Sequence, residues 1–221
     1  MRRLAICAVL KEEELAAMMA ITRYRSLAPG EMIFEEGEPA RSLYNVASGT
    51  VRIYKLLPNG RRQITGFLFA GDFLGLASPK AYAYGAEAVT EVNLCQFDSA
   101  AFKSLVDRFE TVKSRLLERA NDELTVAQEQ MLLLGRKTPL AKLSSFLLRL
   151  SSNNARWERP VDTIELSMTR EDIADYLGLT IETVSRTFTK LKGDGVIALP
   201  ERSRVVIREF DKLEEIAEDF D

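Results

Sequence analysis

The sequence predicts an α+β protein with an N-terminal antiparallel β-roll, one long helix and a C-terminal winged helix-turn-helix. Three features of the chain predict this order. Hydrophobic residues alternate with period two, among many Gly and Pro, from Tyr24 to about Phe97. A helical period then runs from Ser99 to Gly135, and two short helices meet at Gly178.

The expected domains follow these changes of pattern. A chain of 221 residues with 46% hydrophobic content is large enough for two packed cores. We place a leading helix and the β-roll in residues 1–98, and the long helix and a hinge in residues 99–137. The winged domain takes residues 138–221.

The composition argues against enzymatic and metal chemistry. The chain contains no histidine, which excludes Ser–His and Cys–His catalysis, histidine metal sites and the usual haem ligand. Cys7 and Cys95 lie too far apart for a metal-binding motif, and so few thiols fit a reducing cytoplasm. The N-terminus lacks a cleavage-site pattern and no apolar run approaches about 20 residues, so we expect neither a signal peptide nor a membrane span.

The first domain is expected to open with a short amphipathic helix over Lys11 to Ala20. Short runs rich in β-branched and aromatic residues follow, and pairs such as Pro29-Gly30 and Ser48-Gly49 mark turns between them. The predicted strands are residues 32–34, 43–46, 50–56, 63–67 and 92–97. Many short strands at regular spacing predict an antiparallel roll.

The long helix carries a heptad-like apolar stripe with one stutter near its middle. Its residues are Leu105, Phe109, Val112, Leu116, Ala120, Leu124, Ala127, Met131 and Leu134. Two interpretations stay open. The length of the stripe favours a parallel partner helix and hence a homodimer, whereas a helix lying on its own β domain would show the same pattern.

The second domain is expected to begin after a hinge at residues 135–139. Pro139 suits the first turn of a new helix that ends near Leu150. Residues 151–162 are mostly polar and predict a loop. Residues 163–166 predict a strand just before the helix-turn-helix.

The helix-turn-helix is organised around a glycine. Thr169 is suited to cap the first helix, Gly178 to end it in the left-handed conformation, and Thr180 to cap the second. Apolar residues at helical spacing from Ile173 to Leu191 form the predicted core of this motif.

A β-hairpin is expected after the second helix, with strands at residues 196–199 and 204–207. A helix-turn-helix followed by such a wing is typical of DNA-reading modules. The net charge is −3, but acidic residues concentrate in residues 209–221, whereas residues 139–208 carry a small excess of Lys and Arg. This modest excess suits a regulator that depends on base contacts more than on a polycationic groove.

The exposed face of the second helix decides the predicted function. Glu182, Ser185 and Arg186 are spaced i, i+3 and i+4, so they project from one face. A carboxylate can accept a hydrogen bond from the cytosine amine, and a hydroxyl can bond to either a donor or an acceptor on a base edge. A guanidinium group can donate two hydrogen bonds at once, to O6 and N7 of guanine. The residues expected to contact phosphates are Thr169, Arg170, Thr180, Thr183, Thr187 and Lys190. The alternative is an ordinary solvated helix face with a surface ion pair.

These features together resemble the CRP/FNR superfamily of bacterial transcription regulators over nearly the whole chain. The second helix carries the Glu-x-x-Ser-Arg signature of the FNR and FixK branch as Glu182, Ser185 and Arg186. Further similar segments are residues 42–44, 48–50, 63–67, 70–72 and 177–180.

The resemblance implies a cytoplasmic, homodimeric activator of the FixK type with a β-roll similar to a cyclic-nucleotide-binding domain. Its partner would be double-stranded DNA with a palindromic site of the TTGAT-N4-ATCAA kind. Glu182 and Arg186 would read the inner C·G and G·C pairs, and Ser185 would support the neighbouring T. The resemblance also implies recruitment of RNA polymerase to genes for low-oxygen respiration or nitrogen fixation.

The chain departs from the sensor chemistry of this superfamily. FNR proteins hold a [4Fe–4S] cluster through four thiolates, but Cys7 is the only cysteine upstream of Cys95. The acidic residue and the Arg–Ser pair that hold the cyclic nucleotide in CRP are missing from residues 71–85. We therefore expect no cofactor and a structural role for Cys95. The alternative function is a regulator whose β-roll binds an unidentified effector that gates DNA binding.

Overall fold

The structure is a computed structural model that describes residues 10–58, 60–76 and 80–219. Cys7 and the predicted turn residue Asn59 lie outside the described residues. The chain forms two compact units, Met1–Glu123 and Leu124–Asp221. The segment 99–137, expected as one domain, is therefore divided between the two units.

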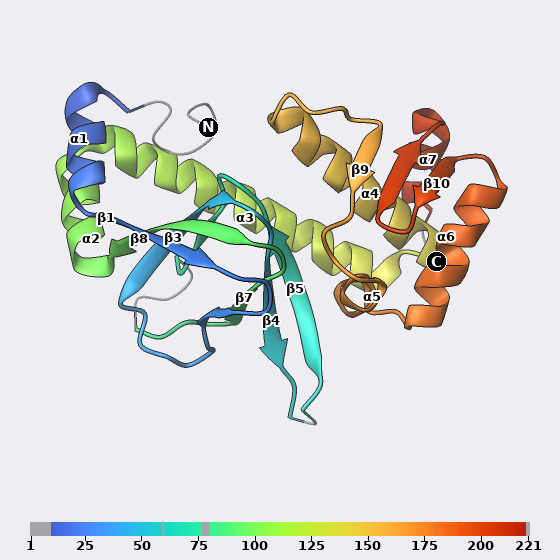
Figure 1. Ribbon diagram of the computed structural model, residues 1–221, viewed down its shortest axis with the longest axis horizontal. Helices are drawn as coiled ribbons and strands as arrows, with labels where there is room; N and C mark the ends of the chain where they lie inside the picture. Colours follow the sequence, from blue (N-terminus) through green and yellow to red (C-terminus); the bar gives the residue numbers. More distant parts are fainter. Residues whose placement is uncertain (1–9, 59, 77–79, 220–221) are drawn as a thin grey trace. The chain divides into compact units, whose positions relative to one another are not determined.

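Two four-stranded antiparallel sheets form the β-roll of the first unit (Figure 1). Their strand orders are β1-β8-β3-β6 and β2-β7-β4-β5. The strands are β1 (Thr22–Leu27), β2 (Met32–Phe34), β3 (Ser42–Ser48), β4 (Val51–Leu56), β5 (Arg62–Leu68), β6 (Phe73–Leu74), β7 (Gly85–Ala88) and β8 (Val92–Asp98). Each predicted strand is present, as β2, β3, β4, β5 or β8, and β1, β6 and β7 complete the sheets.

The core of the roll joins side chains from both sheets. Val46 and Leu94 from one sheet and Val51 and Ala86 from the other are fully buried in a single apolar cluster. Alternation with period two places these residues on the inner face of each strand. The antiparallel roll predicted from that alternation is confirmed.

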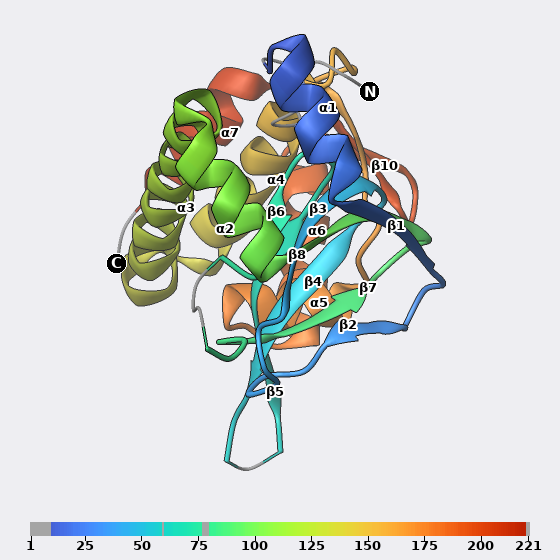
Figure 2. The ribbon, with the colours of Figure 1, turned by 90° about the vertical axis from the view of Figure 1, so that its left-hand side faces the viewer.

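The helices of the first unit are α1 (Glu12–Ala20), as predicted, α2 (Ser99–Arg108) and the first part of α3 (Glu110–Arg136), which continues into the second unit. Helices α1 and α2 lie side by side at one end of the roll (Figure 2). The single helix expected from Ser99 is wrong, because the backbone of Phe109 is extended, with φ −121° and ψ 107°. The break allows the apolar sides of both helices to pack on the roll.

The second unit contains the end of α3, four further helices and a three-stranded antiparallel sheet with order β10-β11-β9. Its elements are α4 (Pro139–Arg156), β9 (Thr163–Glu165), α5 (Arg170–Leu177), α6 (Ile181–Gly193), β10 (Ile197–Glu201), β11 (Arg204–Ile207) and α7 (Phe210–Ala217). The helix-turn-helix is α5 and α6, and β10 and β11 form the wing. Strand β9, predicted before the helix-turn-helix, pairs with β11.

Helix α4 is longer than predicted. It begins at Pro139 with Thr138 as its N-cap, but it ends at Arg156 and not near Leu150. Its polar last turns hold the chain that follows: the Ser151 hydroxyl donates to the Val161 carbonyl at 2.7 Å, and the Asn154 amide donates to the Pro160 and Thr163 carbonyls at 3.0 and 2.9 Å. These polar residues therefore belong to the helix.

Helix α7 lies in the tail that sequence analysis distinguished only by its acidity. It packs against α4, and its Leu213 and Ala217 are buried. The Lys137 ammonium donates to the Ala217 carbonyl at 2.7 Å, which satisfies one carbonyl at the end of α7. The acidic residues that dominate its composition face solvent on the other side.

Candidate nucleic-acid interface

The first helix of the motif is closed at both ends by the predicted residues. The Thr169 hydroxyl accepts the backbone N–H of Asp172 at 3.1 Å, and the Asp172 carboxylate accepts the backbone N–H of Thr169 at 3.0 Å, which forms a capping box. Gly178 ends α5 with φ +62° and ψ 41°. This left-handed conformation turns the chain toward α6.

The second helix of the motif begins at the predicted cap. The Thr180 hydroxyl accepts the backbone N–H of Thr183 at 3.2 Å. Six apolar residues predicted to face inward are buried: Ile173, Ala174, Leu177, Val184, Phe188 and Leu191. The burial of the last three fixes which side of α6 packs inside the unit and which side faces solvent.

The three predicted base-reading residues all lie on the solvent-facing side of α6. Glu182, Ser185 and Arg186 are exposed. Hydrogen bonds from its own backbone N–H and from the Thr180 hydroxyl lower the pKa of Glu182, so its carboxylate is charged near neutral pH. Arg186 lies beside Thr183, with Nη2 at 3.5 Å from the threonine hydroxyl. The face thus presents a carboxylate acceptor, a hydroxyl and a guanidinium donor side by side.

Four of the predicted phosphate-contacting residues surround this face. Thr169, Thr180 and Lys190 are exposed and Thr183 is half-buried. The Lys190 ammonium lies 3.0 Å from the Asp194 carboxylate one turn further along the helix. This exposed ion pair is weak in water and leaves the lysine able to contact a phosphate.

The structure corrects the prediction for Thr187. This residue is only 6% exposed, and its hydroxyl donates to the Thr183 carbonyl at 2.8 Å. It lies among the inward-facing residues of α6, so it does not present its hydroxyl to a phosphate.

Arg170 also departs from the predicted role. Its guanidinium lies over the Phe188 ring, with Cζ 3.3 Å from the ring centroid, and Nη2 donates to the Arg202 carbonyl at 3.4 Å. Burial and the charge of Arg202 lower the pKa of Arg170 to about 10, which keeps it charged near neutral pH. In this position Arg170 connects α6 to the wing and is turned away from solvent.

Two exposed residues near the same face were not among the predicted contacts. Ile181, the first residue of α6, is 44% exposed, and an apolar side chain there matches a thymine methyl group. Arg202 is exposed in the turn of the wing. A basic residue inside a predicted hairpin turn was the signal that could have identified it.

The predicted dimer stripe divides into two parts with different environments. Leu105 and Val112 are buried in the apolar cluster of their own unit, and Phe109 and Leu116 are half-buried against it. Leu105 and Val112 are therefore wrong as partner contacts, because the same unit already covers them, whereas Phe109 and Leu116 keep part of their surface exposed and stay predictions. For Leu105 and Val112 the alternative interpretation, packing on their own domain, holds.

The remaining stripe is exposed and has a regular heptad spacing. Leu117, which the prediction passed over in favour of Leu116, is 63% exposed. Leu124 is 58%, Met131 72% and Leu134 39% exposed, and Ala120 and Ala127 are exposed between them. The stripe is thus Leu117, Ala120, Leu124, Ala127, Met131 and Leu134, with steps alternating between three and four residues and no stutter.

Aromatic side chains occupy the interior of the β-roll. The Phe34 and Tyr82 rings stack with centroids 3.7 Å apart, and Tyr44 and Tyr84 lie against Phe34 at 5.8 and 5.7 Å. The Tyr82 hydroxyl donates to the Ser42 carbonyl at 2.9 Å, and the Tyr84 hydroxyl accepts the Gly75 N–H at 3.2 Å. Burial raises the pKa of both phenols, so the two side chains are uncharged near neutral pH.

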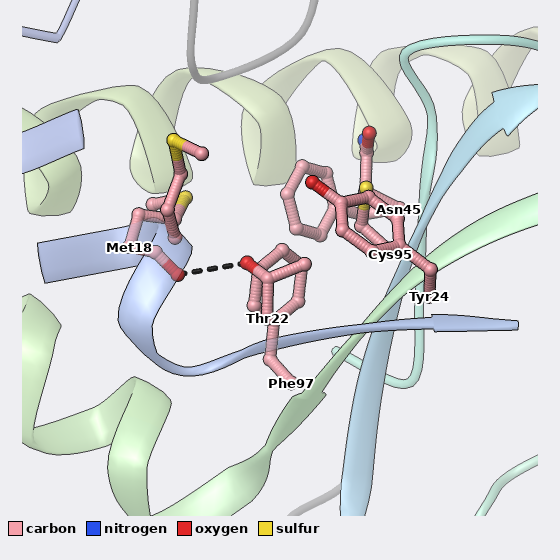
Figure 3. Close-up of a pocket in the computed structure, with 8 residues that line it drawn as sticks. Met18, Thr22, Tyr24, Asn45, Cys95 and Phe97 are labelled. Carbon is pink, nitrogen blue, oxygen red and sulfur yellow. Dashed lines mark hydrogen bonds between the residues drawn. The ribbon is translucent and has the colours of Figure 1, made fainter. Parts of the chain in front are cut away.

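Cys95 lines a small surface pocket of about 50 Å³ (Figure 3). The lining residues are Met18, Met19, Thr22, Tyr24, Asn45, Phe73, Cys95 and Phe97. Cys95 is half-buried and packs against the apolar cluster that contains Phe97. Within residues 10–58, 60–76 and 80–219, no group of His, Cys, Asp or Glu side chains has the arrangement needed to hold a metal ion.

Two family models match the chain, one for each unit. Residues 24–109 match the cyclic nucleotide-binding domain, and residues 141–216 match the Crp-like helix-turn-helix domain. In the described part of the chain, no helix has the length and apolar character needed to cross a membrane.

Relatives similar to this chain over most of its length include bacterial regulators. The chain is 42% identical over 214 residues to the transcriptional activatory protein AadR of Rhodopseudomonas palustris, covering 96% of this chain and 90% of AadR. It is 43% identical over 198 residues to the nitrogen fixation regulation protein FixK of Bradyrhizobium diazoefficiens, covering 90% and 84%. The structure of FixK2 from Bradyrhizobium japonicum matches with a TM-score of 0.84 at 34% identity, covering 90% of this chain and 98% of FixK2. This chain therefore belongs to the CRP/FNR family of DNA-binding transcription regulators.

Proposed function

We propose that this protein is a FixK-type transcription activator that binds a palindromic TTGAT-N4-ATCAA-like DNA site as a homodimer. One observation carries the proposal: Glu182, Ser185 and Arg186 share the exposed face of a capped recognition helix. The chemistry of this face suits base edges in a major groove. AadR, named as a transcriptional activatory protein, supports the role of activator, and FixK, named for nitrogen fixation regulation, supports the role of regulator.

Each residue of this face has a separate role in the proposal. The Arg186 guanidinium donates to O6 and N7 of guanine, and the Glu182 carboxylate accepts from the N4 amine of cytosine. Ser185 supports the neighbouring thymine, and Ile181 contacts a thymine methyl group. The charged state of Glu182 near neutral pH is the state that this acceptor role needs.

Contacts to the DNA backbone hold the recognition helix in register without reading sequence. In the proposal, Thr169, Thr180, Thr183 and Lys190 make these contacts from α5 and α6, and Arg202 adds one from the wing. Arg170 has a positioning role, because it joins Phe188 of the recognition helix to the backbone of the wing.

The homodimer forms in this proposal through the exposed stripe from Leu117 to Leu134. A parallel pair of α3 helices would bury the stripe, with Ala120 and Ala127 allowing a close approach of the two backbones. The two recognition helices would then enter successive major grooves about 34–36 Å apart, which matches a palindromic site.

The remaining parts of the proposal concern the cellular role. A cytoplasmic activator would recruit RNA polymerase to promoters that carry the site. The relatives named for nitrogen fixation regulation support genes of nitrogen fixation as targets, and the resemblance to the FixK branch adds genes for low-oxygen respiration to the proposal.

A direct test is fluorescence anisotropy with the purified full chain and a labelled TTGAT-N4-ATCAA duplex. The competitor is a scrambled duplex of the same length and composition, and the salt concentration is the same in both titrations. We expect the cognate duplex to bind at least about a thousandfold more tightly. Equal affinity for both duplexes would contradict the proposal.

A second candidate function is a regulator gated by a small effector. The match of residues 24–109 to the cyclic nucleotide-binding domain favours it. The stacked rings of Phe34 and Tyr82 and the bonded Tyr84 hydroxyl argue against a nucleotide in the roll, because they already occupy its interior.

DNA affinity separates the two functions. A gated protein binds DNA weakly until its effector arrives, because only the competent fraction binds. We expect tight specific binding without any additive and no change on addition of cyclic AMP. A gain of about tenfold or more with the nucleotide would instead favour the gated regulator.

A further inference from the structure

The end of α3 contacts the helix-turn-helix through a side-chain hydrogen bond. The Gln130 amide donates to the backbone carbonyl of Tyr176 with an N–O distance of 3.0 Å. Tyr176 lies in the last turn of α5, where backbone carbonyls lack donors within the helix. Gln130 therefore supplies a donor to the first helix of the motif from outside it.

A second contact joins the next turn of α3 to the same place. A Cβ atom at Gly178 would lie only 3.2 Å from Leu134 Cδ2, so the leucine covers the turn between α5 and α6. The adjacent Leu133 is buried. The last two turns of α3 thus hold both the end of α5 and the turn that follows it.

The same two turns of α3 that make these contacts also carry part of the exposed apolar stripe. Ala127 and Met131 face solvent, whereas Gln130 contacts α5 and Leu133 is buried within the same unit. Consequently, the part of α3 that would meet a partner helix is also the part that holds the DNA-reading motif.

We propose that Gln130 is a positioning residue that sets the distance between the two recognition helices of the dimer. Its hydrogen bond ties the last turn of α5 to the dimer helix, so each recognition helix keeps one position relative to the dimer axis. This inference rests on the proposed function. In this inference Gln130 determines which spacer length between the half-sites the dimer prefers. Glu182, Ser185 and Arg186 read the bases, which is a separate role.

The test compares spacer preference in the wild type, Gln130→Ala and Gln128→Ala. Gln128 is an exposed glutamine on the same helix and serves as the matched control. Dissociation constants are measured by anisotropy for duplexes with the four-base-pair spacer and with spacers one and two base pairs shorter or longer. A duplex with a single half-site and the thermal midpoint of unfolding are measured beside them.

We expect Gln130→Ala to lower the preference for the four-base-pair spacer by about two- to twelvefold, the range that one net hydrogen bond supplies. Its affinity for the single half-site should equal that of the wild type, because the base-reading face is unchanged. Gln128→Ala should keep the wild-type spacer profile. Gln130→Lys, which keeps a donor on a side chain of similar length, should restore the preference.

An unchanged spacer profile in Gln130→Ala would overturn the inference. Equal weakening on every duplex, including the single half-site, together with a lower unfolding midpoint would also overturn it, because that result describes a purely structural role. If the wild type itself binds the cognate and the scrambled duplex equally, the proposed function fails. That result is distinguishable from the two that overturn only the role of Gln130, because it appears before any substitution is made.

Discussion

At the scale of single residues, Gly178 combines two constraints. Its φ of +62° is a conformation that residues with a Cβ avoid, and an added Cβ would lie 3.2 Å from Leu134. We expect Gly178→Ala to lower the free energy of unfolding by about 1–2 kcal/mol. Urea denaturation followed by circular dichroism measures this change.

The control for this experiment is Gly193→Ala at the end of α6. An added Cβ at that position would meet nothing within 4 Å, and the backbone there has no positive φ. This variant should be as stable as the wild type or slightly more stable, because alanine restricts the unfolded chain. Equal destabilisation of the two variants would show that the turn at Gly178 imposes no special constraint.

Lys190 tests the phosphate contacts. Its removal in Lys190→Ala should weaken binding equally on cognate and scrambled duplexes, because a phosphate carries no sequence information. The slope of log K against log salt concentration should fall by about one per half-site. Lys103→Ala, which removes the same charge from an exposed position on α2, should leave the slope unchanged. A loss confined to the cognate duplex would show that Lys190 reads bases.

Helical spacing decides which residues of the site can be predicted from the sequence. Spacing placed Glu182, Ser185 and Arg186 on one face, and they are exposed together. The same spacing contained the signal against Thr187, which follows Val184 by three residues and so lies on the buried side. Arg170 could not be predicted in this way, because its position depends on the ring of Phe188 and on the wing.

At the scale of helices, the exposed stripe on α3 is the surface on which the proposed dimer depends. Leu124→Glu would place an uncompensated charge in the middle of a buried seam, at a cost of about 3–5 kcal/mol. We expect this variant to be monomeric in sedimentation velocity at micromolar concentration. A monomer should also lose most of its affinity for the palindromic duplex.

Leu132 provides the matched control for the seam. It is on the same helix and is 58% exposed, as Leu124 is, but it lies outside the stripe. Leu132→Glu should therefore remain a dimer. A dimer formed by Leu124→Glu, or a monomer formed by Leu132→Glu, would place the dimer contact elsewhere on the chain.

The helices show where sequence patterns are insufficient. An apolar stripe on a helix does not reveal what covers it. In the sequence Leu105 and Val112 are equivalent to Leu124, but in the structure they are buried in the apolar cluster of their own unit. The polar end of α4 looked like a loop because its residues are polar, but Ser151 and Asn154 donate to carbonyls of the returning chain. In α7 the acidic residues concealed an apolar side formed by Leu213 and Ala217.

At the scale of the whole molecule, the order of the parts could be predicted from the sequence. Period-two alternation, a long helical period and a glycine between two capped helices are local patterns, and each corresponds to an element of the structure. The division into units could not be predicted, because α3 belongs partly to each. Tertiary packing, which single-sequence patterns do not contain, decides such boundaries.

The central claim is that α6 presents Arg186 to a guanine, and a double-mutant cycle between protein and DNA tests it most directly. Wild type and Arg186→Ala are each titrated with the cognate duplex and with a duplex in which the proposed guanine pair is replaced. We predict a coupling free energy of about 1–3 kcal/mol per half-site, because each change removes the same contact. A coupling of zero, with Arg186→Ala discriminating between the duplexes as well as the wild type, would contradict the claim.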